Sequence, residues 1–155
     1  MMDLAVEASK EAIAKSGVDP SEIGAVILAT ISFPYQTPSG ASLLSELVGA
    51  QGAAAYDISA ACAGYCYGIA QADALVRSGL CKYVLVVGAE KLSDFISPTD
   101  RTISFLLGDG AGGGARIVTQ SRMVEAGPHV VLKGELAIDL DASSQFTGQV
   151  RDCHV

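Results

Sequence analysis

The sequence contains no tryptophan, few basic residues and no long apolar segment. Its 155 residues include ten Lys and Arg against 17 Asp and Glu, which gives a net charge of −7. We therefore do not expect nucleic-acid binding, because a phosphate backbone requires clustered Lys and Arg. No apolar run approaches the roughly 20 residues of a membrane-spanning helix, and the N-terminal region carries Asp3, Glu7 and Glu11 instead of a basic targeting segment. These absences predict a cytoplasmic protein that does not bind membranes.

The four cysteines predict neither a disulfide framework nor a metal site. A reducing compartment keeps thiols free, and Cys62 and Cys66 lack the second closely spaced pair that a zinc site needs. The adjacent Cys153 and His154 do not supply one. We expect Cys66 and Cys81 to be small apolar core residues.

Half of the residues are hydrophobic and 17 are glycine, which is typical of a buried sheet covered by helices. A chain of this length forms one ordinary domain or a piece of one. Periodicity and stop signals predict helices and strands in alternation, namely helices over 3–15, 41–48 and about 62–78 and strands over 25–31, 53–59 and 83–88. This order predicts an α/β layered domain whose strands are at least partly parallel.

The pattern changes after residue 90. We expect a polar loop over 92–101, a strand over 102–107, a glycine-rich turn over 108–114 and another strand over 115–119. Gly108, Gly110 and Gly113 satisfy the G-x-G-x-x-G spacing of a dinucleotide site, but that site needs a following helix to hold the pyrophosphate. Since the following segment is β-branched, we assign the glycines to a hairpin or to close backbone packing.

Cys62 is the candidate nucleophile of the chain. It follows a predicted strand and stands where the next helix begins, so it adjoins unpaired backbone N–H groups and the positive end of the helix dipole. Both favour the thiolate, which is the attacking species. The alternative is that Cys62 is a buried core thiol.

Three motifs support a family resemblance. They are 57–65 (DISAACAGY), 97–101 (SPTDR) and 108–112 (GDGAG). In this order and spacing, the segment 25–119 resembles the N-terminal half of a β-ketoacyl-acyl-carrier-protein synthase III, a condensing enzyme of the thiolase superfamily. The resemblance implies an α/β, thiolase-like layered fold, about one half of the usual two-half αβαβα architecture. Residues 1–120 would form this half-domain and residues 121–155 an unmatched tail.

The resemblance also implies a two-step reaction. Cys62 would take an acyl group from acyl-CoA, and the acyl-enzyme would condense with decarboxylated malonyl-acyl-carrier protein; no cofactor is expected beyond the CoA thioester substrate. By similarity, Arg101 would approach the nucleotide end of CoA, Leu107 would line the acyl channel, and Thr37 would reach across a homodimer interface. The alternatives are that Arg101 is a solvated charge in a loop, that Leu107 only packs in the core, and that Thr37 is an ordinary polar loop residue.

The family's catalytic His and Asn belong to a second half that this sequence lacks, so we expect an incomplete enzyme. His129 and His154 do not stand in the family's His-Gln-Ala-Asn or Asn-His contexts and inherit no role. Because separating the two halves would expose a large apolar surface, we expect a homo-oligomer or a complementary C-terminal polypeptide. Two other functions stay open, which are a catalytically silent interaction module and a cysteine-dependent thioester hydrolase or acyl carrier.

Overall fold

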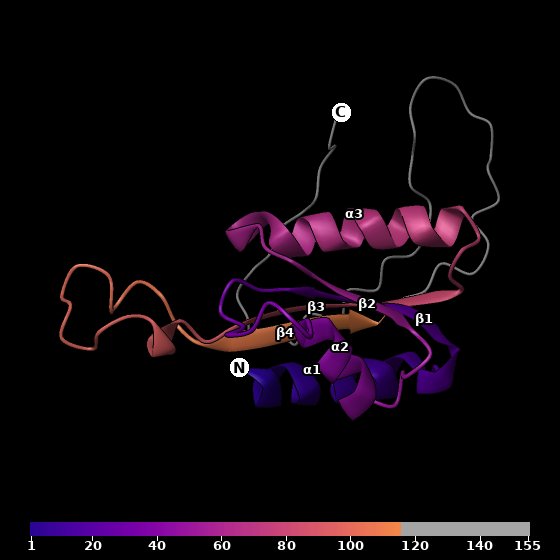
Figure 1. The fold of residues 1–155 in the computed structure, drawn as a ribbon, viewed down its shortest axis with the longest axis horizontal. Coiled ribbons are helices and arrows are strands. Elements are labelled where there is room, and N and C mark those ends of the chain that lie inside the picture. Colours follow the sequence, from indigo (N-terminus) through magenta and orange to yellow (C-terminus); the bar gives the residue numbers. More distant parts are fainter. Residues whose placement is uncertain (116–155) are drawn as a thin grey trace, which may run out of the picture.

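The computed structural model describes residues 1–115 and contains one mixed sheet covered by helices on both faces (Figure 1). The elements in chain order are α1 (Met2–Ser16), η1 (Pro20–Glu22), β1 (Ile23–Ala29), α2 (Gly40–Leu47), β2 (Ala54–Ile58), η2 (Ala61–Ala63), α3 (Gly64–Arg77), β3 (Tyr83–Glu90), η3 (Leu92–Asp94) and β4 (Gly110–Ala115). The strand order is β2-β1-β3-β4. The first three strands are parallel and β4 is antiparallel to β3, so the prediction of a partly parallel sheet is confirmed.

The core lies on both faces of β1 and β3, as expected for strands with continuous apolar sequences. One face packs against α1 and α2 and the other against α3 (Figure 1). The side of α1 and α2 buries Val26, Leu28, Leu85 and Val87. Alternate residues of the same strands form the second cluster, with Ala25, Ile27, Val84 and Val86 beneath α3.

The predicted helices are confirmed, and their ends follow from local chemistry. Gly17 ends α1 with a left-handed φ of 68°, which glycine adopts without steric penalty. At the start of α2, Ser39 accepts a hydrogen bond from the N–H of Ser42 as its N-cap. The carboxylate of Asp57, from the neighbouring β2, also accepts from Gly40 N and Ala41 N at 2.8 and 2.7 Å.

β1 begins and ends two residues earlier than the predicted 25–31. Thr30 N still donates to the carbonyl of Ile58 in β2. The next amide, Ile31 N, donates instead to the Glu90 side chain, so the chain leaves the sheet there.

The strand predicted over 102–107 is wrong, because residues 102–106 form turns and residue 107 has no regular structure, in the loop that extends away from the sheet between β3 and β4 (Figure 1). The Asp100 carboxylate accepts from both Thr102 N and Thr102 Oγ1, and Ser104 N donates to Asp100 O. An aspartate whose side chain accepts a hydrogen bond from the backbone N–H two residues later favours a turn over an extended strand.

The glycine-rich turn predicted over 108–114 is also wrong in part, because residues 110–115 form β4. Of the three glycines for which a hairpin or close backbone packing was expected, only Gly113 shows close packing, since a Cβ at Gly108 or Gly110 would meet no atom within 4 Å. A Cβ at Gly113 would lie 3.3 Å from the carbonyl oxygen of Ala8 in α1. The predicted strand beyond residue 115, the tail 121–155 and the residues His129, Cys153 and His154 lie outside the described residues.

Within residues 1–115, no helix combines the length and the apolar character that crossing a bilayer requires.

Candidate active site

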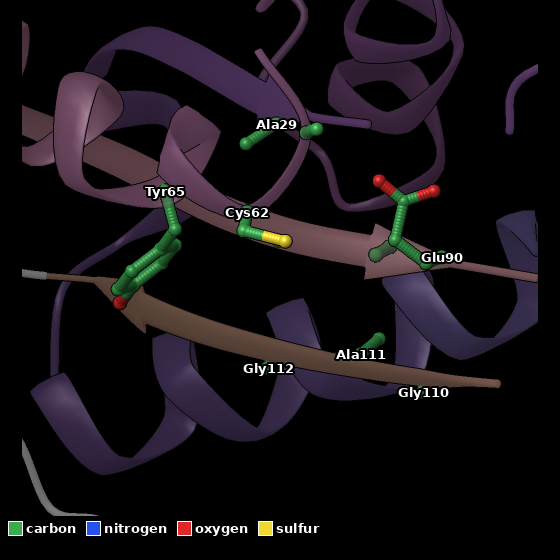
Figure 2. Close-up of a pocket in the computed structure, with 10 residues that line it drawn as sticks. Ala29, Cys62, Tyr65, Glu90, Gly110, Ala111 and Gly112 are labelled. Atoms are coloured by element: carbon green, nitrogen blue, oxygen red, sulfur yellow. The ribbon is translucent and has the colours of Figure 1, made fainter. Parts of the chain in front are cut away.

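An open cavity of ≈ 220 Å³ lies where the parallel strands end, between the start of α3 and the β3–β4 pair (Figure 2). Ala29 and Glu90, the last residues of β1 and β3, form part of its wall. The carboxyl ends of parallel strands are where α/β folds usually place their sites. The cavity is lined by Ala29, Ala61, Cys62, Tyr65, Gly88, Ala89, Glu90, Gly110, Ala111 and Gly112.

Cys62 occupies the turn that joins β2 to α3. It lies in η2, two residues before α3 begins, and Figure 2 shows its Sγ directed into the space bounded by β4 and Glu90. The preceding Ala61 has a left-handed φ of 47°, a conformation that is strained for a residue with a Cβ and that bends the chain sharply. The exposed thiol at the amino end of α3 matches the predicted nucleophile geometry and excludes the buried-core alternative for Cys62.

Two glycines in α3 allow the helix to lie directly on the sheet. A Cβ at Gly64 would approach Ala29 Cβ at 3.1 Å, and a Cβ at Gly68 would approach Val86 Cγ1 at 2.8 Å. This close packing holds the first turn of α3, and with it the Cys62 turn, against the end of β1.

Tyr65 forms one side of the cavity (Figure 2). Its ring packs over Gly88, and a Cβ at Gly114 would lie 3.0 Å from its hydroxyl. Burial of the ring, followed by the neighbouring Cys66 charge, raises the pKa of Tyr65. The hydroxyl therefore stays protonated at neutral pH.

The floor of the cavity is made of backbone. In the β3–β4 ladder, Gly88 pairs with Gly112 and Glu90 pairs with Gly110. These four residues therefore lie on the face of the sheet against which Tyr65 of α3 packs. A Cβ at Gly110 or Gly112 would meet no atom within 4 Å. The absent side chains leave free space in front of the Cys62 sulfur. We did not predict from the sequence that these glycines leave space beside Cys62. Glycines at every second position of a strand are a signal for such an open face, because alternate residues of a strand lie on the same face of the sheet.

Glu90 is a second residue that sequence reasoning missed. Its half-buried carboxylate accepts hydrogen bonds from Ile31 N, Ser32 Oγ and Thr30 Oγ1 at 2.9, 2.5 and 3.4 Å. These partners lie 58 to 60 residues away along the chain. No local sequence pattern could have identified them.

The other predicted site residues do not line this cavity. Arg101 and Leu107 are exposed in the loop between β3 and β4, with Leu107 44% accessible, and Thr37 is exposed in the loop between β1 and α2. Their predicted roles toward CoA, an acyl group and a second subunit stay predictions. Cys66, expected in the core, is exposed, because it lies on the side of α3 away from the sheet, while Cys81 is half-buried.

Asp109, the acidic residue of the GDG segment, fixes the start of β4. Its carboxylate accepts from Ser93 Oγ and Ser93 N at 2.6 and 2.9 Å. These hydrogen bonds lower the pKa of Asp109. Among residues 1–115 there is no group of three or more His, Cys, Asp or Glu side chains that could hold a metal ion.

The sequence and the fold match known proteins. The family model for 3-oxoacyl-[acyl-carrier-protein (ACP)] synthase III matches residues 56–133. The β-ketoacyl-[acyl-carrier-protein] synthase III of Kocuria rhizophila is 55% identical over 130 residues, which cover 84% of this chain and 36% of that protein. Synthase III 1 of Streptomyces coelicolor is 46% identical over 127 residues, covering 82% and 36%.

Crystal structures give the same result. The synthase III from Aquifex aeolicus matches with a TM-score of 0.71 and 41% identity over 75% of this chain and 38% of that chain. The enzyme from Thermus thermophilus matches with a TM-score of 0.71 and 37% identity over 78% and 37%. These matches confirm the predicted thiolase-like half-fold. The chain spans 36% of the length of the two curated relatives, and it belongs to the β-ketoacyl-acyl-carrier-protein synthase III family.

Proposed function

We propose that this chain carries the nucleophile-bearing part of a β-ketoacyl-acyl-carrier-protein synthase III and acts in the first step of an acyl condensation. The observation that carries the proposal is the exposed thiol of Cys62, which points into a cavity at the amino end of α3 (Figure 2). The positive end of a helix dipole stabilises negative charge on a thiol and on a developing oxyanion. Family membership supplies the reaction class.

In the first step, the Cys62 thiolate attacks the carbonyl carbon of acyl-CoA. The new bond joins Sγ to that carbon, the bond from the carbon to the CoA sulfur breaks, and CoA leaves as a thiol after taking up a proton. The backbone N–H of Cys62 is the local candidate donor to the oxyanion. The resulting acyl-cysteine is itself a thioester, so it conserves the free energy needed for the next step.

In the second step, malonyl-acyl-carrier protein loses carbon dioxide, and the resulting enolate carbon attacks the acyl group on Cys62. The thiolate is released and the product is a β-ketoacyl-acyl-carrier protein. In this family a His and an Asn stabilise the enolate, and in this proposal both come from outside residues 1–115. Arg101 would bind the nucleotide end of CoA, Leu107 would contact the acyl chain, and Thr37 would contact a second subunit.

Intact-mass spectrometry after incubation with acetyl-CoA tests the first step. We expect one acetyl group on the wild-type chain and on Cys66→Ser, which removes a second exposed thiol four residues away, and none on Cys62→Ser. Labelling that persists in Cys62→Ser would contradict the proposal. The fate of the acetyl group then separates the functions. Release of free acetate supports a thioester hydrolase, and a β-ketoacyl product after addition of malonyl-acyl-carrier protein supports condensation. A stable acetyl-cysteine fits an acyl carrier or a synthase part that lacks its His and Asn, whereas an unlabelled wild-type chain supports a silent module.

A further inference from the structure

The carboxylate of Glu90 joins the end of β3 to the segment that leaves β1. Oε1 accepts from Ile31 N at 2.9 Å, and Oε2 accepts from Ser32 Oγ at 2.5 Å and from Thr30 Oγ1 at 3.4 Å. Figure 2 shows the carboxylate turned away from β4 at the edge of the Cys62 cavity. The paired residue on β4 is Gly110, which has no side chain to compete for this space.

The partners of Glu90 form a closed network. Ser32 is only 3% exposed, and its Oγ donates to Glu90 while accepting from Lys91 N at 2.9 Å. Ser32 N donates in turn to Thr30 Oγ1 at 3.1 Å. Because the buried Ser32 hydroxyl both donates and accepts a hydrogen bond, its orientation is fixed. The network therefore holds residues 30–32 against the end of β3.

The same network reaches the turn that holds Cys62. Thr30 N donates to the carbonyl of Ile58 at 3.1 Å, and Ile58 is the last residue of β2, four positions before Cys62. Glu90 thus connects the ends of the three parallel strands at the edge where the thiol lies.

The loop 31–39 is held at both ends by carboxylates from the two strands that flank β1. Glu90 of β3 holds its first residues. At its far end, Asp57 of β2 accepts from Gly40 N and Ala41 N, the first amides of α2. The loop, which includes Thr37, is therefore fixed between two strands.

We infer that Glu90 is a positioning residue of the site, which acts through Thr30 and Ser32 to fix the loop 31–39 and the turn that presents Cys62. It does not need to touch a substrate for this role. The inference depends on the proposed function only in taking Cys62 as the reactive group. Removal of the carboxylate leaves Ile31 N and Ser32 Oγ without their acceptor, and the space vacated by the Glu90 side chain adjoins the open cavity, so water can enter it. The loosening should therefore be local and should not spread through the core.

Hydrogen exchange and thiol alkylation, measured on the full chain by mass spectrometry, test this role. In Glu90→Ala we expect amide exchange to accelerate about tenfold in the peptide covering 30–39. The rate at which iodoacetamide modifies Cys62 should change by roughly threefold or more, because the turn 59–63 is no longer fixed. Exchange in α1 should not change. The matched control is Glu46→Ala, an exposed glutamate on α2, which should alter neither rate.

Two further variants keep the test decisive. Ser32→Ala removes the hydrogen bonds of Ser32 Oγ to Glu90 and from Lys91 N without removing a charge. It should therefore accelerate exchange in 30–39 even if Glu90→Ala does not fold. Glu90→Gln keeps one carbonyl oxygen for Ile31 N and should lie between the wild type and Glu90→Ala. Unchanged exchange in 30–39, or an equal rise in α1, would overturn the inference. Alkylation requires no acyl transfer, so this result is independent of whether acetyl-CoA labels Cys62.

Discussion

Access to the Cys62 thiol depends on side chains that are absent as much as on those that are present. Gly112 faces the thiol from β4, and a Cβ built there would meet no atom within 4 Å. The added methyl of an alanine would therefore enter the cavity without displacing protein atoms. The free space in front of the sulfur is set by the β4 backbone.

We predict that Gly112→Ala narrows the approach to Cys62 and leaves the fold intact. Alkylation of Cys62 by a bulky maleimide should slow several-fold more than alkylation by iodoacetamide, and the free energy of unfolding should change by less than about 1 kcal/mol. Gly108→Ala is the matched control, because its Cβ also meets no atom within 4 Å and it lies outside the cavity. If Gly112→Ala slowed neither reagent, or slowed both to the same extent, the prediction that the added methyl narrows the approach would be wrong.

Asp109 should make the free energy of unfolding depend on pH, with the fold less stable in strong acid. Hydrogen bonds from Ser93 lower the pKa of Asp109 in the folded chain, so the ionised carboxylate stabilises the fold at every pH above its unfolded pKa, about 3.9. That contribution is lost as the pH falls through the lower, folded-state pKa. Ser93→Ala should therefore be less stable than the wild type near neutral pH, and the difference should disappear in strong acid. Urea denaturation over this range checks the prediction; in an Asp109→Asn background, Ser93→Ala should lose this pH dependence.

At the scale of elements, the sequence predicted those whose signals are local. Apolar periodicity located α1 and α3, and glycines with left-handed φ at Gly17 and Gly79 mark where these helices end. β4 was missed because a glycine run has no apolar pattern, and its extended form depends on pairing with β3 and on packing against α1. The same distinction holds for the site. Cys62 could be predicted from the local strand-to-helix turn, whereas the hydrogen-bond partners of Glu90 lie about 60 positions away in the sequence.

Asp57 connects two elements and has a predictable energetic role. Its two hydrogen bonds satisfy amides at the start of α2 that have no acceptor within the helix. Asp57→Ala should reduce the free energy of unfolding by about 2 kcal/mol, and Asp57→Asn, which keeps one accepting oxygen, should lose about half of that. Asp73→Ala, which breaks a surface pair with Arg77, should lose no more than about 0.5 kcal/mol. Equal urea midpoints for Asp57→Ala and Asp73→Ala would contradict this assignment.

At the scale of the whole molecule, the surface of the described residues carries large exposed apolar side chains. Tyr67 on α3 is 56% exposed, Leu80 just after α3 is 76% exposed, and Phe105 in the loop between β3 and β4 is 78% exposed. Exposed apolar surface marks interaction sites in soluble proteins where it gathers into a large patch. It supports the expectation that another polypeptide, either a second copy or a complementary one, packs against this chain.

We predict that the purified chain self-associates in the absence of a complementary polypeptide. Covering apolar surface lowers the free energy by about 25 cal/mol for each Å² removed from water, so the outer face of α3, which the sheet does not cover, is the expected contact. Sedimentation velocity should show species larger than a monomer whose proportion rises with protein concentration, and Tyr67→Ser should shift the distribution toward the monomer. Leu43→Ser changes an exposed leucine of α2 on the opposite side of the sheet and should leave the distribution unchanged. A single monomeric species at all concentrations would exclude self-association.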